Sequence, residues 1–214
     1  MIKHVIFDLD GTLIDSAEDI IDSLEQAFSM CQVPLKQRLS RSFIGPPIRE
    51  IINKVSPELS SKEVAQLIST FRDIYDNSVY PKTHPYTGVR ELLNDLKLQQ
   101  ISMFIVTNKP RVPTERLLDK LNLRSYFKDI ICINDHQFAT KVEMVTWLLN
   151  QYSLETQVTM MIGDTLQDVL AGISNCLVTA AYLGGYGNSG ELAASQAQFK
   201  FGHIISVKYL INHI

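Results

Sequence analysis

An apolar run that ends in two aspartates constrains this chain more than any other stretch. Residues 4–7 read His-Val-Ile-Phe, and Asp8-Leu9-Asp10-Gly11 follows. A continuous apolar run is typical of a strand buried on both faces. Side chains two residues apart on an extended chain point to the same side, so Asp8 and Asp10 can face one small volume. Two such carboxylates repel each other unless a cation or a shared proton offsets the charge, and carboxylate oxygens suit Mg²⁺. The stretch predicts a magnesium site.

The four residues from Asp8 to Gly11 have two other interpretations. They can form a plain polar turn or part of a calcium loop. An EF-hand loop needs a third ligand before its glycine and a helix in front of the loop, and the sequence shows neither. The polar turn and the magnesium site both stay open on these residues alone.

Length, charge and cysteine spacing limit the class of protein. The chain has 214 residues, 45% of them hydrophobic, which is enough for one large core with a smaller lobe or for two modest domains. Its net charge is −3 and no basic cluster stands out, so no nucleic-acid partner is expected. Cys31, Cys132 and Cys176 form no Cys-x-x-Cys pair, which disfavours disulfides and a zinc site. We expect a reducing, cytoplasmic compartment.

No signal for a membrane or for export is present. Nowhere do 18 apolar residues run together, so no membrane span is expected. Met1 leads directly into the first strand without a cleavable leader, so we expect an unprocessed protein.

Residues 15–82 show helical patterns and no strand pattern. A helix begins after Ser16, and two more are expected at 48–55 and 60–79. We therefore expect residues 15–82 to form an all-helical cap inserted after the first strand. We expect the rest of the chain, residues 1–14 and 83–214, to form the core domain.

From residue 88 onward, apolar runs alternate with helical patterns. Strands are expected at 101–106, 130–133, 158–162 and 177–182, with a short one at 203–205. This alternation predicts a parallel sheet with right-handed crossovers and helices on both faces. The expected fold class is α/β, a Rossmann-like parallel-sheet core with an inserted all-helical cap domain. Ligands bind such sheets beyond the carboxyl ends of the strands.

Polar residues follow three further strands. Thr107 and Asn108 follow the second strand, Lys141 opens the helix after the third, and Asp164 and Asp168 follow the fourth. Taken singly, each has a structural interpretation as a helix cap, a solvated lysine or an acid that offsets the helix dipole. Together they place four carboxylates, which need a cation, beside groups suited to phosphate.

These motifs resemble the haloacid dehalogenase-like superfamily of aspartyl-phosphate phosphohydrolases. The first motif is the stretch 8–16, the second is Thr107-Asn108, and the fourth is Gly163-Asp164-x-x-x-Asp168. The resemblance covers nearly the whole chain, including a helical cap after the first strand. The third motif departs from the pattern, because Val142-Glu143 follows Lys141 where relatives often have proline. Lys109 is the alternative, and Lys141 is preferred because it follows the third strand.

The resemblance implies that Asp8 is the nucleophile, which forms an aspartyl-phosphate, and that Asp10 is the general acid and base. It implies that Asp8, the backbone carbonyl of Asp10 and Asp164 hold Mg²⁺, with Asp168 as a ligand or an orienting group.

The resemblance also implies that Thr107, Asn108 and Lys141 bind the phosphoryl group and stabilise its charge.

Two stretches narrow the resemblance to one group of enzymes within the superfamily. Residues 106–110 and 183–187 look like phosphoglycolate phosphatases and their pyrophosphatase relatives. The expected partner is a small phosphorylated metabolite, and the expected assembly is a monomer or homodimer. The presence of Asp10 disfavours a dehalogenase activity, because the dehalogenases lack this second aspartate. A β-phosphoglucomutase-like mutase stays an alternative. A receiver-like phosphate-binding module is disfavoured, since its phosphoacceptor is not on the first strand and it has no helical insertion.

A cation at the start of the second cap helix suggests how the leaving group is recognised. Arg49 follows a rigid Gly-Pro-Pro loop, and it could pair with a carboxylate such as that of phosphoglycolate. The alternative is an exposed arginine that pairs with Glu50 or with nothing.

Overall fold

Six parallel strands form the central sheet, in the order β5-β4-β1-β6-β7-β8. The structure is a computed structural model and describes residues 1–212. Strand β1 (His4–Phe7) lies in the middle of the sheet, between β4 (Ser102–Thr107) and β6 (Thr159–Gly163). Further out lie β5 (Asp129–Cys132), β7 (Val178–Tyr182) and β8 (Phe199–Phe201). The end of β1 therefore has a neighbouring strand on each side.

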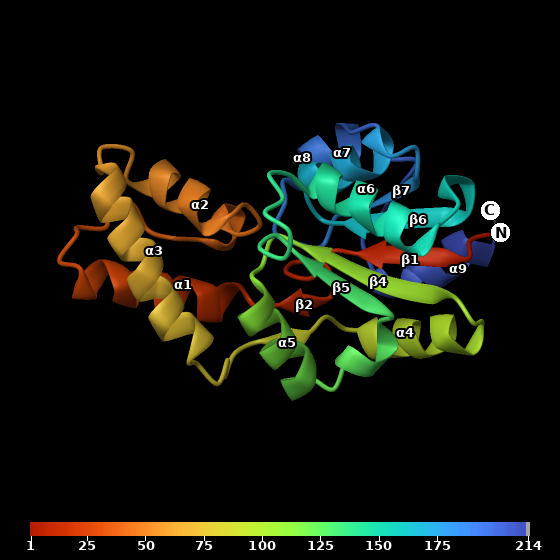
Figure 1. Cartoon of the computed structure of the whole chain (residues 1–214), viewed down its shortest axis with the longest axis horizontal. Coiled ribbons are helices and arrows are strands. Elements are labelled where there is room, and N and C mark those ends of the chain that lie inside the picture. The colour runs from red at the N-terminus through yellow and green to blue at the C-terminus, as the bar shows by residue number, and fades with distance from the viewer. Residues whose placement is uncertain (213–214) are drawn as a thin grey trace.

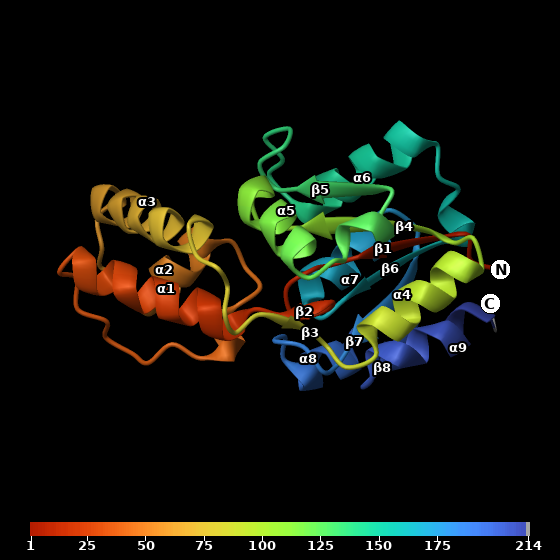
Figure 2. The same cartoon turned by 90° about the horizontal axis from the view of Figure 1, so that it is seen from below.

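Helices cover both faces of this sheet (Figure 1). Val5 and Phe7 of β1 pack in one apolar core with residues of α4 (Val89–Leu98), α5 (Arg111–Lys120) and α9 (Val207–Asn212). Figure 2 shows α4 and α9 side by side.

On the opposite face, Ile6 packs with α6 (Lys141–Tyr152) and α7 (Leu166–Ser174). Because both faces are buried, β1 is apolar at every position from Val5 to Phe7, as its sequence predicts. The predicted α/β class with a Rossmann-like parallel sheet is confirmed.

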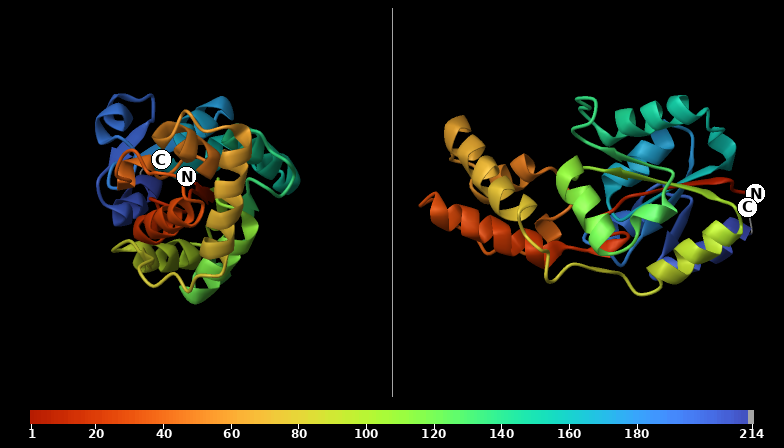
Figure 3. Two further views of the ribbon diagram at one scale, coloured as in Figure 1. Left: turned by 90° about the vertical axis from the view of Figure 1, so that its left-hand side faces the viewer. Right: turned by 60° about the horizontal axis from the view of Figure 1, so that its bottom comes forward.

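Three helices form a separate layer at one end of the molecule. They are α1 (Ala17–Met30), α2 (Ile48–Val55) and α3 (Ser61–Asp76), with a short 3₁₀ turn at Arg41–Phe43. Helix α1 packs against α3, and both lie far from the N-terminus (Figures 1 and 3). We call these helices and their connecting loops the cap. The helical character predicted for this segment is observed, while the long third helix ends at Asp76 rather than at residue 79.

Two short strands join the cap to the core. Strand β2 (Ile14–Asp15) pairs antiparallel with β3 (His84–Pro85), so the two chain crossings lie side by side. The sequence did not predict this pairing, because two residues per strand are too few to show a period.

The C-terminal region differs from the prediction. The strand expected at 203–205 is wrong, because β8 lies at Phe199–Phe201 and residues 204–206 form a 3₁₀ turn. A short apolar run does not distinguish a strand from a helical turn. Helix α8 (Ser189–Ala194) precedes β8. Among residues 1–212, no helix is long and apolar enough to cross a membrane.

Candidate active site

Asp8 and Asp164 extend beyond neighbouring strands of the sheet. The backbone N–H of Asp8 donates to the carbonyl of Ile162 at 2.9 Å, which continues the β1–β6 pairing to the carboxylate. Gly11 turns the chain away with a φ of +87°, and a Cβ there would lie 2.3 Å from an Asp164 carboxylate oxygen. Both the backbone angle and the close approach therefore require glycine.

Three buried carboxylates gather at this edge of the sheet. Asp8, Asp164 and Asp168 each offer an oxygen, and these atoms lie within 4.8 Å of one another. Burial raises the pKa of Asp8 well above its usual range and raises the pKa of Asp164 to about 7, with the charge of Asp168 adding to the effect on Asp164. A divalent cation offsets such charge, and an all-oxygen set of donors suits Mg²⁺.

Lys141 contacts two of these carboxylates. Its ammonium is 2.9 Å from Asp8 Oδ1 and 2.6 Å from Asp168 Oδ1. Burial opposes the charge, but Asp168 and Asp8 raise the pKa of Lys141 above its usual value. Asp168 Oδ2 accepts from the backbone and side chain of Thr165, at 2.9 and 2.7 Å. Because one oxygen of Asp168 contacts a cation and the other accepts two hydrogen bonds, Asp168 is better placed to orient Lys141 than to bind a metal directly.

Asp164 is held by residues to which the sequence had assigned no role. Thr12 Oγ1 donates to its Oδ1 at 2.6 Å, and the backbone N–H of Tyr186 donates to its Oδ2 at 2.8 Å. The Tyr186 hydroxyl accepts from the N–H groups of Ser16 and Ala17 at 2.6 and 3.0 Å. One tyrosine thus links a carboxylate of the core to the start of the first cap helix. Its only signal in the sequence is the glycine-rich loop around it.

Asp10 has different partners from Asp8. Lys109 donates to both of its oxygens, at 3.1 and 3.0 Å, and the hydroxyl of Ser16 donates to Oδ1. The sequence left Lys141 and Lys109 as alternatives for the lysine of the third motif. In the structure they have different partners: Lys141 contacts Asp8, and Lys109 contacts Asp10.

A cavity of about 130 Å³ opens between the core and the cap. On the core side, Asp8, Asp10, Thr107, Asn108 and Lys109 line it. The cap side is mostly apolar, with these side chains among its lining: Ile20, Ile44, Ile48, Ile51 and Phe71.

Thr107 and Asn108 line this cavity and are held by hydrogen bonds. Thr107 is buried, and its Oγ1 accepts from the N–H of Lys109 at 3.1 Å. The Asn108 amide donates to Gln167 Oε1 at 2.8 Å and to the carbonyl of Gly45, in the cap, at 3.4 Å. Asn108 therefore joins the cap loop to the core at the site.

The structure does not bring Arg49 into this cavity. Arg49 is exposed and lines an adjoining hollow between α2 and α3, which shares Pro47, Ile48 and Arg72 with the cavity. Helix α2 presents Ile48 and Ile51 to the cavity, and this orientation turns the intervening Arg49 outward. The cap cation that lines the cavity is Arg72 on α3, which the sequence analysis had not singled out.

This fold and this cluster define an α/β protein with its acidic residues at the carboxyl edge of a parallel sheet. Residues 5–181 match the model of a family described as haloacid dehalogenase-like hydrolase, and the chain belongs to that family.

Relatives and solved structures agree. The phosphoglycolate phosphatase of Vibrio vulnificus is 28% identical over 92% of this chain and 91% of its own. Pyrophosphatase PpaX of Halalkalibacterium halodurans is 30% identical, over 89% of this chain and 86% of its own. A crystal structure described as a predicted phosphatase from Clostridium acetobutylicum superposes with a TM-score of 0.90 at 25% identity and covers 100% of both chains. The predicted family and enzyme class, a phosphoric monoester hydrolase, are confirmed.

Proposed function

We propose that this protein is a magnesium-dependent phosphatase that hydrolyses a small phosphate monoester through an aspartyl-phosphate on Asp8. The observation that carries the proposal is the buried cluster of Asp8, Asp164 and Asp168 with Lys141 against the first and last of them.

Asp8 is the proposed nucleophile because of where its two oxygens lie. Oδ1 is occupied by Lys141. Among residues 1–212 no hydrogen bond or ion pair involves Oδ2, while Asp8 lines the cavity. The covalent step forms a bond from this carboxylate to phosphorus and breaks the bond to the leaving oxygen, so one difficult transfer becomes two easier ones.

Asp10 is the proposed proton donor to the leaving oxygen and the acceptor of a proton from the attacking water. It lines the same cavity as Asp8. Thr107, Asn108 and Lys141 are proposed to hold the phosphoryl oxygens, since hydroxyl, amide and ammonium donors at fixed positions stabilise charge in phosphoryl transfer.

The oxygen donors at the site fit a magnesium ion. Asp8, Asp164 and the backbone carbonyl of Asp10 are the proposed ligands, and Asp168 is proposed to orient Lys141. When bound, the ion supplies positive charge that lowers the repulsion between the carboxylates and the substrate.

The first substrate to test is phosphoglycolate, which appears in the names of relatives. Its carboxylate needs a cation on the cap side of the cavity, and Arg72 is the proposed one. Pyrophosphate is the second candidate, because a relative is named a pyrophosphatase. A mutase related to β-phosphoglucomutase is the third, and it would return phosphate to the sugar instead of releasing it.

The test is phosphate release from phosphoglycolate, pyrophosphate and p-nitrophenyl phosphate, with Mg²⁺ and with EDTA. We expect turnover of at least one monoester with Mg²⁺, none with EDTA and none in Asp8→Asn. The matched control is Asp119→Asn, an exposed aspartate on α5, which should keep wild-type turnover. Turnover in EDTA or in Asp8→Asn would contradict the proposal.

A further inference from the structure

Lys109 lies between the core and the cap. Its ammonium is 3.1 and 3.0 Å from the two carboxylate oxygens of Asp10, and it stands 4.6 Å from the centre of the Tyr75 ring. Its side chain is 5% exposed. Asp10 follows the first strand of the core, whereas Tyr75 is on cap helix α3. One buried cation therefore contacts both lobes.

These contacts leave Lys109 little freedom. Its backbone N–H donates to Thr107 Oγ1 at 3.1 Å, which fixes the residue at the end of β4. A buried ammonium that contacts a carboxylate on one side and an aromatic face on the other has a favourable partner on each side. The geometry fixes the orientation of the Asp10 carboxylate more firmly than the single hydroxyl of Ser16 could.

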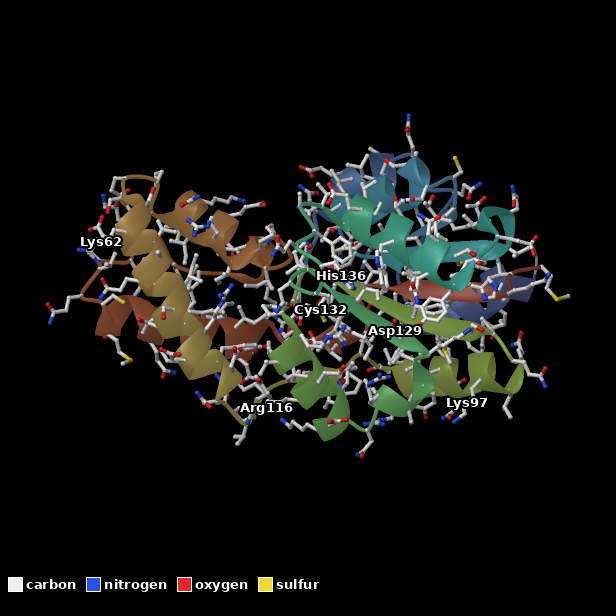
Figure 4. All side chains as sticks on the ribbon, viewed as in Figure 1. Lys62, Lys97, Arg116, Asp129, Cys132 and His136 are labelled. Carbon is white, nitrogen blue, oxygen red and sulfur yellow. The ribbon has the colours of Figure 1, made fainter. Side chains whose placement is uncertain are left out.

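The end of helix α3 that carries Tyr75 is itself tied to the core. Arg116 of α5 donates to the backbone carbonyl of Asp76, the last residue of α3, and Lys120 donates to that of Tyr80 in the loop that follows. Figure 4 labels Arg116 where α5 faces that end of α3. The Tyr75 hydroxyl has no hydrogen-bond partner among the described residues. The contact between Tyr75 and Lys109 is made by the aromatic ring.

Given the proposed phosphatase function, on which this inference rests, we propose that Lys109 is a positioning residue for Asp10. Tyr75 makes the alignment of Asp10 depend on the position of the cap. In the first chemical step, the bond from Asp8 to phosphorus forms as the bond to the leaving oxygen breaks. The leaving oxygen keeps the electron pair and takes the proton from Asp10, and Lys109 then lies against the carboxylate that remains.

The test compares two esters that differ in their need for a proton. Ethyl phosphate has a leaving oxygen that must be protonated, and p-nitrophenyl phosphate has one that leaves without help. In single-turnover measurements with Mg²⁺, we expect Lys109→Met to slow the step by about 100-fold for ethyl phosphate and by less than about threefold for p-nitrophenyl phosphate. A phosphate-binding or merely structural role for Lys109 predicts equal losses on both esters, which would overturn the inference.

Two variants of Tyr75 test the coupling without removing a buried charge. Tyr75→Leu removes the ring, and we expect it to slow ethyl phosphate selectively by about threefold to tenfold. Tyr75→Phe keeps the ring and should keep the wild-type ratio of the two rates. Equal ratios in Tyr75→Leu and Tyr75→Phe would overturn the coupling to the cap.

The control is Lys128→Met. Lys128 stands 4.8 Å from the centre of the Tyr152 ring, away from the site, and its loss should change neither rate. If the wild-type protein releases phosphate neither from these two esters nor from phosphoglycolate, the proposed function fails. If it hydrolyses both and the ratio does not change in Lys109→Met, only the role of Lys109 fails.

Discussion

Lys141 joins Asp8 to Asp168, with its ammonium 2.9 Å from one carboxylate and 2.6 Å from the other. All three side chains are almost fully buried. The lysine therefore offsets part of the negative charge that the site concentrates, and it orients the proposed nucleophile before any ligand is present.

Removal of this charge should destabilise the protein strongly. Lys141→Met leaves two buried carboxylates without their partner, and we expect the free energy of unfolding in urea to fall by about 3 kcal/mol. The control is Lys36→Met, which removes the exposed ion pair with Glu58 and should change little. Equal losses in the two variants would contradict a structural role for the buried pair.

Magnesium should stabilise the protein more as the pH rises. Burial raises the pKa of Asp164 from 3.8 to about 7, so its protonated form favours the folded state. Without metal, this contribution is fully present below pH 3.8 and is lost as the pH rises through about 7. Because Mg²⁺ binds the carboxylate form, the difference in Tm with and without Mg²⁺ should grow over this range.

The variant Asp164→Asn checks the source of this dependence. This variant should abolish most of the increase with pH in the Tm difference between samples with and without Mg²⁺. If the wild-type protein shows the same Tm difference at every pH, the assignment of Asp164 as a ligand is contradicted.

The Tyr186 hydroxyl should stabilise the junction of core and cap. Tyr186→Phe leaves the buried N–H of Ser16 without its acceptor and leaves the N–H of Ala17 with only a long bond to Asp15 Oδ1 at 3.4 Å, and we expect a loss of about 1 to 3 kcal/mol in the free energy of unfolding. The exposed Tyr209→Phe is the matched control and should be neutral. A neutral Tyr186→Phe would mean that other groups satisfy these donors.

Substitution of Arg72 and substitution of Arg49 should have different effects on the hydrolysis of a carboxylated substrate. If phosphoglycolate is hydrolysed, Arg72→Ala should lower kcat/KM for it by about tenfold to a hundredfold, with p-nitrophenyl phosphate nearly unaffected. Arg49→Ala should change neither, because Arg49 lies outside the cavity. A selective loss in Arg49→Ala instead would restore the role expected from the sequence.

Much of the fold could be predicted because its signals are local. Val5 to Phe7 are apolar at successive positions, which is the pattern of a central parallel strand, and Asp8 follows where that strand ends. The motif residues could be placed together because the carboxyl ends of parallel strands share one edge.

The contacts that orient the site could not be predicted in this way. Tyr186 and Ser16 are 170 residues apart, and no spacing in the sequence indicates their hydrogen bond. The direction of Arg49 depends on how α2 rotates against the core, which is set by the packing of Ile48 and Ile51. Lys109 and Lys141 both follow strands, and only the structure shows which of them contacts Asp8.

The most direct test of the proposed mechanism is to trap the phosphorylated protein. The protein is mixed with Mg²⁺ and the ester that it turns over fastest, quenched in acid within one turnover, and digested for peptide mass spectrometry. We expect one added phosphoryl group on the peptide that contains Asp8, with fragment ions that place it on that residue, and no phosphopeptide from Asp8→Asn. Phosphate release at the wild-type rate with no phosphoryl group on Asp8, or with the group on another residue, would contradict Asp8 as the nucleophile.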